Sequence, residues 1–468
     1  MYGFRRVTKP LALLVIAALF LGFGCKGESP EIAAAAKPVT IQIWGVFDDQ
    51  DAYSQIIADY KIAHPYASVV YKKFRPEEYE RELLNALAED RGPDVFMMHN
   101  TWVQGYRTKI APLPKSVNIA ELVIKGTVKK EQVYELHAKP SVSVRQFQSA
   151  FPDQVVRDAV ISEKTDSGTL ESIAGLPLSV DTLALYWNRP LLNAAGVSEP
   201  PKTWTDFQNV VKKITKADAQ GEITQSGAAL GSSQNVERAK DILSLLMMQN
   251  GAIMTDENGF PTFEQMPPGL GGRDLPPGTE AAIFYTDFAN PNKEVYTWSE
   301  KQPSSLDAFV TGKTAMFFGY SWHLPLIRAR APKLKFGIAP ATQTGELEKN
   351  FANYWLYTVS KKSKHQNIAW DFIQFMTAEK EAKKYLETTK RPTALRSLIP
   401  SQAEDVDLGV FANQILTSES WYRGADVEAA EKAMSDLIDA LLAGEKPQEA
   451  INTASDRVSQ TILPKSQE

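Results

Sequence analysis

The chain has 468 residues, of which 43% are hydrophobic and 23% are charged, and its formal net charge is −5 at neutral pH. This length exceeds what one hydrophobic core usually holds, so two domains or lobes are expected. The acidic balance argues against nucleic acid or an anionic membrane surface as a partner. After residue 24 no stretch is long and apolar enough to span a bilayer, and the composition is typical of a globular protein.

The N-terminus has the pattern of a targeting segment. Three basic residues within the first nine precede a short apolar run at 11–23, and Cys25, the sole cysteine, follows at once. This order resembles a bacterial lipoprotein site. The resemblance implies a signal peptide over residues 1–24, its removal, and a lipid on the new N-terminal cysteine.

One residue of this pattern departs from the usual site. Gly22 stands where such sites prefer leucine, three residues before the cysteine, and an uncleaved membrane anchor is the alternative interpretation. Residues 25–38, which are rich in alanine with two prolines, are predicted to form a flexible tether. With one cysteine no intramolecular disulfide can form, so the fold depends on its core.

Strands and helices are predicted to alternate after the tether. Alternating apolar residues indicate strands, and apolar residues three and four apart indicate helices. The predicted elements are a strand at 39–44, a helix at 52–63, a strand at 68–74, a helix at 79–89 and a strand at 94–98. This order is typical of an α/β lobe.

Residues 111–172 have a weaker pattern, which we interpret as mostly helical. A second α/β region then begins with a strand at 176–186, and Thr203 is predicted to cap the next helix. Further elements are predicted as helices at 234–250, 369–376 and 429–442, strands at 336–340 and 355–359, and a helix–turn–strand unit at 306–318.

The sequence contains no recognisable catalytic or metal-binding constellation. Its five histidines never pair at metal-ligand spacing, and no H-E-x-x-H, C-x-x-C or G-x-S-x-G motif occurs. We therefore predict a protein without enzyme activity, metal or cofactor. A glycoside hydrolase is the enzymatic alternative, because two carboxylates at a fixed separation leave no signature in a single sequence.

A series of short motifs resembles one family. In chain order they are GPDV at 92–95, GLP at 175–177, DT at 181–182, Y-x-N at 186–188, AG at 195–196, PP-x-TW at 200–204, F-x-x-GKTAM at 309–316, GYSW at 319–322 and AWDFIQF at 369–375. Together they resemble the extracellular solute-binding proteins of ABC importers, the group that includes maltose-binding protein.

The resemblance covers nearly all of residues 39–445 and implies a two-lobed α/β fold. Each lobe is expected to hold a mostly parallel sheet flanked by helices, with a ligand cleft at the hinge. In that family the chain crosses between the lobes more than once. The implied first lobe comprises 39–110 and 306–353, and the second comprises 111–305 and 354–468.

Five of the nine tryptophans follow a predicted strand or a glycine turn, near the sheet edge where ligands of open α/β sheets bind. They are Trp44, Trp102, Trp322, Trp355 and Trp421. Flat aromatic faces suit the C–H faces of sugar rings, so all five are candidate ligand contacts. Packing in the core is the alternative for each, because tryptophan is usually mostly buried.

Polar candidates lie beside these tryptophans. Asp49 follows the first strand, and the pair His99 and Asn100 follows the GPDV strand, where the family commonly places substrate-binding residues. Asp181 lies within a strand, where a carboxylate is costly unless it is paired. A structural ion pair with an arginine is the alternative for Asp181.

The resemblance implies two further site residues. Tyr320 lies in the turn that leads to the GYSW tryptophan, and Arg391 matches a family loop that reaches the cleft mouth. A surface arginine is the alternative for Arg391.

From these patterns we expect a receptor of an ABC importer that closes two lobes over a sugar or oligosaccharide and delivers it to the permease. It is expected to be a monomer, extracytoplasmic, and attached to the membrane by its lipid alone. A secreted glycoside-active enzyme and a peptide- or polyamine-binding protein are the alternatives. A third class, an adhesive surface lipoprotein, is disfavoured because the motifs occur in the same order as in the solute-binding family.

Substitution of the cysteine tests the anchoring. Cys25→Ser is expected to release the protein into the soluble fraction or to leave an unprocessed precursor, because no thiol remains to accept lipid. Cell fractionation and intact mass spectrometry report both outcomes. The lipoprotein interpretation fails if the variant stays membrane-bound with the normal mature mass.

Overall fold

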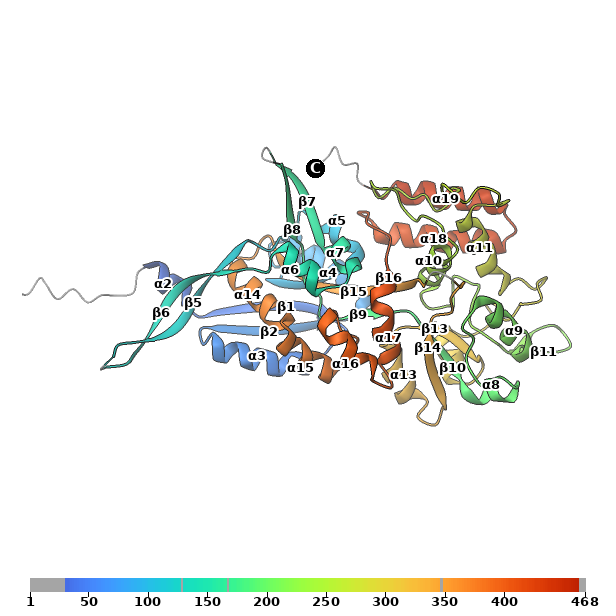
Figure 1. The fold of residues 1–468 in the computed structure, drawn as a ribbon, viewed down its shortest axis with the longest axis horizontal. Helices are drawn as coiled ribbons and strands as arrows, with labels where there is room; N and C mark the ends of the chain where they lie inside the picture. The colour runs from blue at the N-terminus through green and yellow to red at the C-terminus, as the bar shows by residue number, and fades with distance from the viewer. Residues whose placement is uncertain (1–29, 128, 166–167, 346–347, 463–468) are drawn as a thin grey trace, which may run out of the picture.

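The computed structural model describes residues 30–127, 129–165, 168–345 and 348–462, which form two lobes side by side (Figure 1). Each lobe has its own hydrophobic core. Two-lobed α/β architecture is therefore confirmed. Cys25 and the predicted leader lie outside the described residues. Within those residues no helix is long and apolar enough to cross a membrane.

The first lobe is built on a sheet that has seven strands in the described part of the chain, in the order β16-β15-β3-β1-β2, with β4 and β9 also paired to β15. Their bounds are β1 Val39–Val46, β2 Ala67–Phe74, β3 Val95–His99, β4 Ile110–Ala111, β9 Val180–Thr182, β15 Asn350–Ser360 and β16 Ser418–Glu419. β1 runs parallel to β2 and β3, whereas β15 runs antiparallel to β3. The three strands predicted first are confirmed, and β3 is almost entirely buried, as its apolar run indicates.

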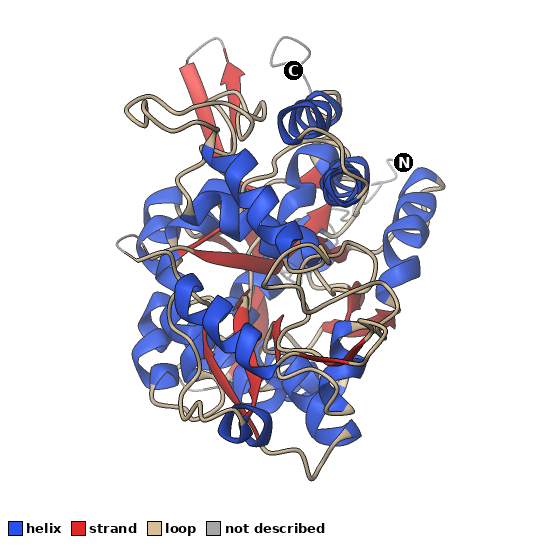
Figure 2. Cartoon of the chain, turned by 90° about the vertical axis from the view of Figure 1, so that its right-hand side faces the viewer, coloured by secondary structure: helices blue, strands red, loops and turns tan. Residues whose placement is uncertain are grey.

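Helices pack around the sheets of both lobes (Figure 2). In the first lobe they are α3 Asp51–Ala63, α4 Pro76–Ala88, α5 Val103–Tyr106, α6 Val144–Ala150, α7 Asp153–Ala159, α14 Gln366–Thr377, α15 Glu379–Thr389 and α16 Ile399–Ala403, with short 3-10 turns η1 Asn100–Trp102 and η2 Arg396–Leu398. A short helix, α2 Pro30–Ala35, occupies part of the segment that we expected to be a flexible tether.

The prediction of a mostly helical segment at 111–172 is wrong. Two antiparallel hairpins, β5–β6 (Ser116–Lys125 and Glu131–Pro140) and β7–β8 (Val160–Thr165 and Gly168–Ile173), flank α6 and α7. The first hairpin projects from the lobe (Figure 1). Much of its outer part is solvent-exposed, so polar residues interrupt the alternation that would have identified its strands.

The second lobe contains a small antiparallel sheet in the order β13-β10-β14. The expectation of a mostly parallel sheet is therefore wrong for this lobe. Its strands are β10 Ala184–Asn188, β13 Met316–Gly319 and β14 Phe336–Pro340, with a separate pair β11 Lys216–Ala217 and β12 Ile223–Gln225. The helices are α8 Arg189–Ala194, α9 Trp204–Ile214, α10 Ala239–Gln249, α11 Pro277–Asp287, α12 Ser305–Val310, α13 His323–Arg330, α18 Val427–Leu442 and α19 Pro447–Ser459.

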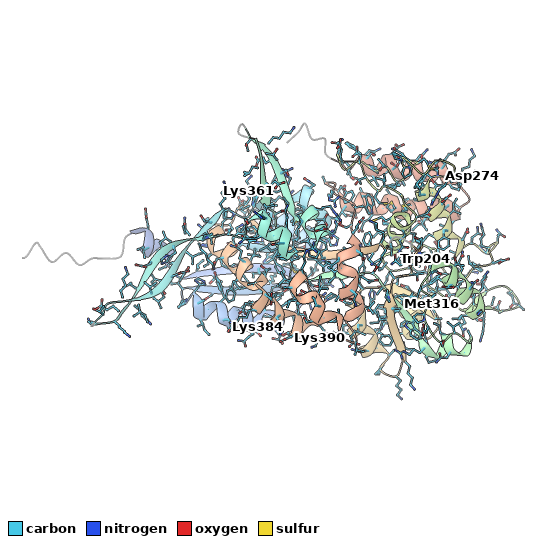
Figure 3. All side chains as sticks on the ribbon, viewed as in Figure 1. Trp204, Asp274, Met316, Lys361, Lys384 and Lys390 are labelled. Atoms are coloured by element: carbon cyan, nitrogen blue, oxygen red, sulfur yellow. The ribbon has the colours of Figure 1, made fainter. Side chains whose placement is uncertain are left out.

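The capped helix α9 shows how local sequence builds this lobe. The hydroxyl of Thr203 accepts a hydrogen bond from the backbone N–H of Asp206 at 3.2 Å, which confirms the predicted N-cap. Trp204 and Met316 both belong to the second core and lie within this lobe in Figure 3.

Three segments cross between the lobes, and two of them pair with the third. They are β9, the start of β15, and the run from α17 (Gly409–Gln414) through η3 (Ile415–Thr417) to β16. Asn353 of β15 is opposite Asp181 of β9, and Phe351 of β15 is opposite Glu419 of β16. This ribbon is the natural hinge of the molecule.

The two cores divide the chain differently from the expected boundaries. Buried residues from Leu306 to Phe351 pack in the second core, and those from Leu113 to Val180 and from Ala352 to Ile399 pack in the first. The physical reason is the pairing of β13 and β14 with β10, a contact between distant segments that periodicity does not report.

Candidate functional site

Between the lobes, described residues line two cavities. The aromatic cavity holds about 510 Å³, part of it open to solvent, and its walls include Phe47, Asp48, Asp181, Trp322, Trp355 and Arg391. The charged cavity holds about 460 Å³, also partly open, and its walls include His99, Asn100, Arg238, Lys240, Trp421 and Glu431. Asn353 of the hinge strand β15 lines both.

The aromatic cavity has indole rings from opposite lobes. Trp355 lies on β15 of the first lobe, and Trp322 caps the N-terminus of α13 in the second. Phe47 packs edge-on against Trp355 with ring centroids 5.7 Å apart, and 38% of its surface is exposed. Its backbone has φ 68°, a left-handed conformation that is costly for a bulky residue and is typically found at functional sites.

A buried ion pair forms the polar wall of this cavity. Both Nε and Nη2 of Arg391 donate to Oδ1 of Asp48, at 3.0 and 2.8 Å, and the Tyr385 hydroxyl donates to Oδ2 at 2.6 Å. Burial lowers the pKa of Arg391, but Tyr385 and Asp48 more than offset this and raise it above its usual value. Arg391 therefore remains a cation in the cavity wall, with Nη1 outside this pairing.

Asp181 holds the turn that presents Trp322. Its carboxylate accepts hydrogen bonds from the Ser321 backbone N–H at 3.0 Å and from the Ser321 hydroxyl at 2.6 Å. Burial raises the pKa of Asp181, and these hydrogen bonds oppose that shift. Its hydrogen-bond partners are the backbone N–H of Thr182 and the backbone N–H and hydroxyl of Ser321. Asp181 thus lines the cavity as expected, and it makes a turn-stabilising contact with Ser321 in place of the alternative ion pair with an arginine.

Paired charged side chains line the charged cavity. Arg238, the N-cap of α10, has a left-handed backbone with φ 57°, and its Nε and Nη2 donate to the carboxylate of Asp241 at 2.7 and 2.8 Å. Glu431 of α18 accepts from Arg238 at 3.3 Å and also from Lys240. On the facing wall, His99 Nε2 lies 3.2 Å from Oδ1 of Asn353.

Seven of the eleven expected ligand contacts line the cavities. They are Asp181, Trp322, Trp355 and Arg391 in the aromatic cavity, and His99, Asn100 and Trp421 in the charged cavity. Trp102 packs behind the wall, 5.1 Å from Trp355 between ring centroids.

The other three expected contacts lie elsewhere. Trp44 packs on Phe74 with ring centroids 4.6 Å apart, and exposed Asp49 pairs with Lys73 at 2.9 Å. Tyr320 is fully buried and donates to Asp241 at 2.6 Å, so it supports the charged cavity from inside the core.

Sequence reasoning missed several cavity residues. Asp48 lines the aromatic cavity in place of its neighbour Asp49, which was the expected contact, and no local signal marks Arg238 or Glu431. Groups of three or more histidine, cysteine or carboxylate side chains that could hold a metal are absent from the described ranges.

A two-lobed fold with a cleft lined from both lobes defines a ligand-binding receptor. The chain belongs to the family of bacterial extracellular solute-binding proteins, whose model matches residues 44–383. Recognition of this family from the sequence motifs is thereby confirmed.

Curated relatives are distant. The chain is 25% identical over 233 residues to a multiple sugar-binding protein of Streptococcus mutans, in a match that covers 49% of this chain and 53% of the relative. The chain thus spans about half the length of that relative. The present chain is also 22% identical over 408 residues to a galactooligosaccharide-binding protein of Bacillus subtilis, in a match that covers 84% of this chain and 82% of the relative.

Solved structures support the fold. The sugar-binding protein MalE of Xanthomonas citri superposes with a TM-score of 0.67 at 18% identity, covering 90% of this chain and 97% of that one. At this level of identity the likeness concerns the fold, and the ligand has to be argued from the site.

The charged cavity makes stability depend on pH through His99. Burial, and then the positive charge of Arg238, lower the pKa of His99 from 6.5 to about 4. The unfolded chain therefore binds a proton at His99 at a higher pH than the folded chain does. The contribution of neutral His99 to the free energy of unfolding is lost as pH falls from about 6.5 to about 4. In His99→Gln the fall in stability between pH 7 and pH 5 should be smaller by on the order of 1–2 kcal/mol. Urea unfolding at both pH values measures this difference, and identical falls in the two proteins would rule out a neutral, half-buried His99.

Proposed function

We propose that this protein is the receptor of an ABC importer and binds a sugar or oligosaccharide between its lobes. The observation that carries the proposal is the aromatic cavity, in which Trp355 and Trp322 come from opposite lobes beside the pair Asp48 and Arg391. Aromatic faces suit the C–H faces of a sugar ring, and the charged groups suit its hydroxyls. Closure of the lobes brings both sets of groups onto one ligand.

The hinge supports closure by rotation of one lobe against the other. Three crossing segments joined as a ribbon bend together and keep each lobe's core intact. A ligand that contacts both walls stabilises the closed state, because the open state does not make both sets of contacts.

A binding role is favoured over glycoside hydrolysis by the state of the cavity carboxylates. Asp48 is engaged by Arg391 and Tyr385, and Asp181 by the backbone and hydroxyl of Ser321. A glycosidase needs one carboxyl free to give a proton and a second free to attack or to activate water. The relatives described above are likewise named as binding proteins.

A lipid on Cys25 would hold the receptor outside the cytoplasm beside its permease, after removal of residues 1–24. The permease, the lipid anchor and a monomeric state are inferred from the sequence pattern and the family.

A ligand panel tests the binding role. The panel contains saccharides that appear in the names of the relatives and neighbours: tagatose, mannobiose, maltotetraose and diacetylchitobiose. A sugar at a hundred times its dissociation constant should add about 2.7 kcal/mol to the free energy of unfolding, seen as a raised melting temperature. Small-angle scattering should show a smaller radius of gyration with that sugar. Failure of every saccharide, or turnover of one, would count against the proposal.

Replacement of Trp322 separates stacking from packing. Trp322→Ala should weaken sugar binding by about 1–3 kcal/mol, ten- to a hundredfold, because a ring face is lost from the aromatic cavity. Its ligand-free stability should fall by less than the about 3–5 kcal/mol typical of a core tryptophan. Trp44→Ala is the matched control, since Trp44 packs on Phe74 away from both cavities and its loss should leave affinity unchanged. Calorimetric titration and thermal melts of both variants decide, and an unchanged affinity with a large loss of stability in Trp322→Ala would refute stacking.

A further inference from the structure

The β5–β6 hairpin projects from the first lobe at the end where α2 lies (Figure 1). Its base belongs to the first core, in which Val117, Ile119 and Ala120 of β5 are buried. Its outer part is mostly exposed and charged. The described walls of both cavities contain no residue of this hairpin, so its length has to be explained by something other than the ligand cleft.

Polar contacts brace the base of the hairpin against the first lobe. Nζ of Lys139 on β6 donates to Oδ1 of Asp371 on α14 at 2.7 Å, and Asp371 is fully buried. The backbone N–H of Asn118 on β5 donates to the side-chain oxygen of Asn367, also on α14, at 3.1 Å. Separation of Lys139 from Asp371 would leave a buried carboxylate without this cation, which is costly. The hairpin is therefore fixed to the first lobe.

One face of the hairpin stays apolar beyond the edge of the core. Tyr134 on β6 packs edge-on against Tyr66 with ring centroids 5.8 Å apart, and Leu122 of β5 is paired opposite Tyr134. Ile124 follows Leu122 by two residues and so lies on the same face of the ribbon. The exposed fraction rises from 37% for Leu122 to 66% for Ile124. The outer end of this face is therefore available to an apolar partner.

Three exposed lysines lie at the tip of the hairpin, next to the exposed isoleucine. Lys125 ends β5, and Lys129 and Lys130 precede β6. Lys125 and Lys129 each pair with a glutamate of β6, whereas the described residues offer Lys130 no ion pair. The tip therefore keeps a positive charge, although the whole chain has a net charge of −5. More distant acidic residues weigh little at the tip, because physiological salt screens exposed charges beyond about 8 Å.

The N-terminal part of the chain lies beside this hairpin. α2 lies against β5 and β6, and Ala36, just after it, packs on the first core. Cys25, the proposed lipid site, precedes Pro30 by only five residues, so it lies within about 18 Å of α2 even if the intervening chain is fully extended. A membrane that holds Cys25 is therefore close to the hairpin.

We propose that the tip of the β5–β6 hairpin is a second membrane contact, in which Ile124 enters the bilayer interface and the three tip lysines meet anionic lipid headgroups. This inference rests on the membrane attachment in the proposed function. Apolar and basic side chains together are typical of segments that lie in a bilayer interface. The anchor makes the contact intramolecular, so a contact that is weak by itself holds the tip at the membrane. The braced hairpin then rests the first lobe on the bilayer.

A fluorescent label at the tip tests this contact. The full-length protein is isolated from cell membranes and reconstituted into vesicles of phosphatidylcholine and phosphatidylglycerol. Thr127→Cys at the tip, and Thr169→Cys on the β7–β8 hairpin, which projects in another direction (Figure 1), each receive a nitrobenzoxadiazole label at an exposed position. Lipids brominated in their acyl chains should quench the Thr127→Cys label roughly twofold, because interfacial segments lie about 5–10 Å into the headgroup boundary. The Thr169→Cys label should stay unquenched.

The unsubstituted protein separates failure of the anchor from failure of the contact. Its sole cysteine, Cys25, takes no label if it carries lipid. A label on Cys25, or recovery of the protein in the soluble fraction, would overturn the anchor and this contact together and leave sugar binding standing. An unquenched Thr127→Cys label on an anchored protein, or equal quenching of the Thr127→Cys and Thr169→Cys labels, would overturn the contact alone.

Substitution of the exposed isoleucine provides a second arm. Ile124→Glu removes the apolar group and repels anionic headgroups, so the quenching of the Thr127→Cys label should fall to the level of Thr169→Cys. Leu170→Glu is the matched control, because Leu170 is 42% exposed on the other hairpin, and it should leave the quenching of the Thr127→Cys label unchanged. Undiminished quenching in Ile124→Glu would refute the insertion of Ile124.

The lipid composition tests the role of the lysines. Vesicles of phosphatidylcholine alone should quench the Thr127→Cys label less than vesicles that also contain phosphatidylglycerol, because the lysines then meet no anionic headgroup. Equal quenching in the two kinds of vesicle would refute the contact between the tip lysines and anionic lipid.

Discussion

The pairing of the three crossing segments β9, β15 and β16 is the constraint on which the rest of the structure depends. β15 starts beside the second core at Phe351 and ends deep in the first sheet beside β3. Asn353 and Asp181, which are opposite each other in this ribbon, line the cavities. Backbone hydrogen bonds across the ribbon therefore fix where the walls of both cavities meet.

Each of three buried aspartates holds one residue or turn of the cavity walls in place. Asp48 holds Arg391, Asp158 orients Asn100, and Asp181 holds the turn before Trp322. A buried carboxylate is costly unless it is hydrogen-bonded or paired, and each of the three meets that requirement with a different kind of partner. These contacts order the cavity walls before a ligand binds. Less conformational entropy is then lost when the lobes close over the ligand.

Local patterns predicted much of the fold. The first three strands, the cap at Thr203 and the helix–turn–strand unit before Trp322 follow from periodicity and capping chemistry, which act over a few residues. The same reasoning placed His99 at the end of β3, where it lines the charged cavity, whereas Trp355 lies in the middle of β15 rather than at a strand end. It failed for the β5–β6 hairpin, because a ribbon that projects from the core lacks the apolar alternation of a half-buried sheet.

The sequence by itself determined the family, the class of fold and which strand ends carry candidate side chains, since each depends on short motifs and neighbouring residues. Only the tertiary structure decided which lobe holds the segment from Leu306 to Phe351, because strand pairing joins residues more than a hundred positions apart. The tertiary structure also decided that Asp48, and not Asp49, lines the cavity, and that Tyr320 is buried against Asp241. Both outcomes depend on contacts with residues far away in the sequence, Arg391 for Asp48 and Asp241 of α10 for Tyr320. No local sequence pattern encodes contacts between such distant segments.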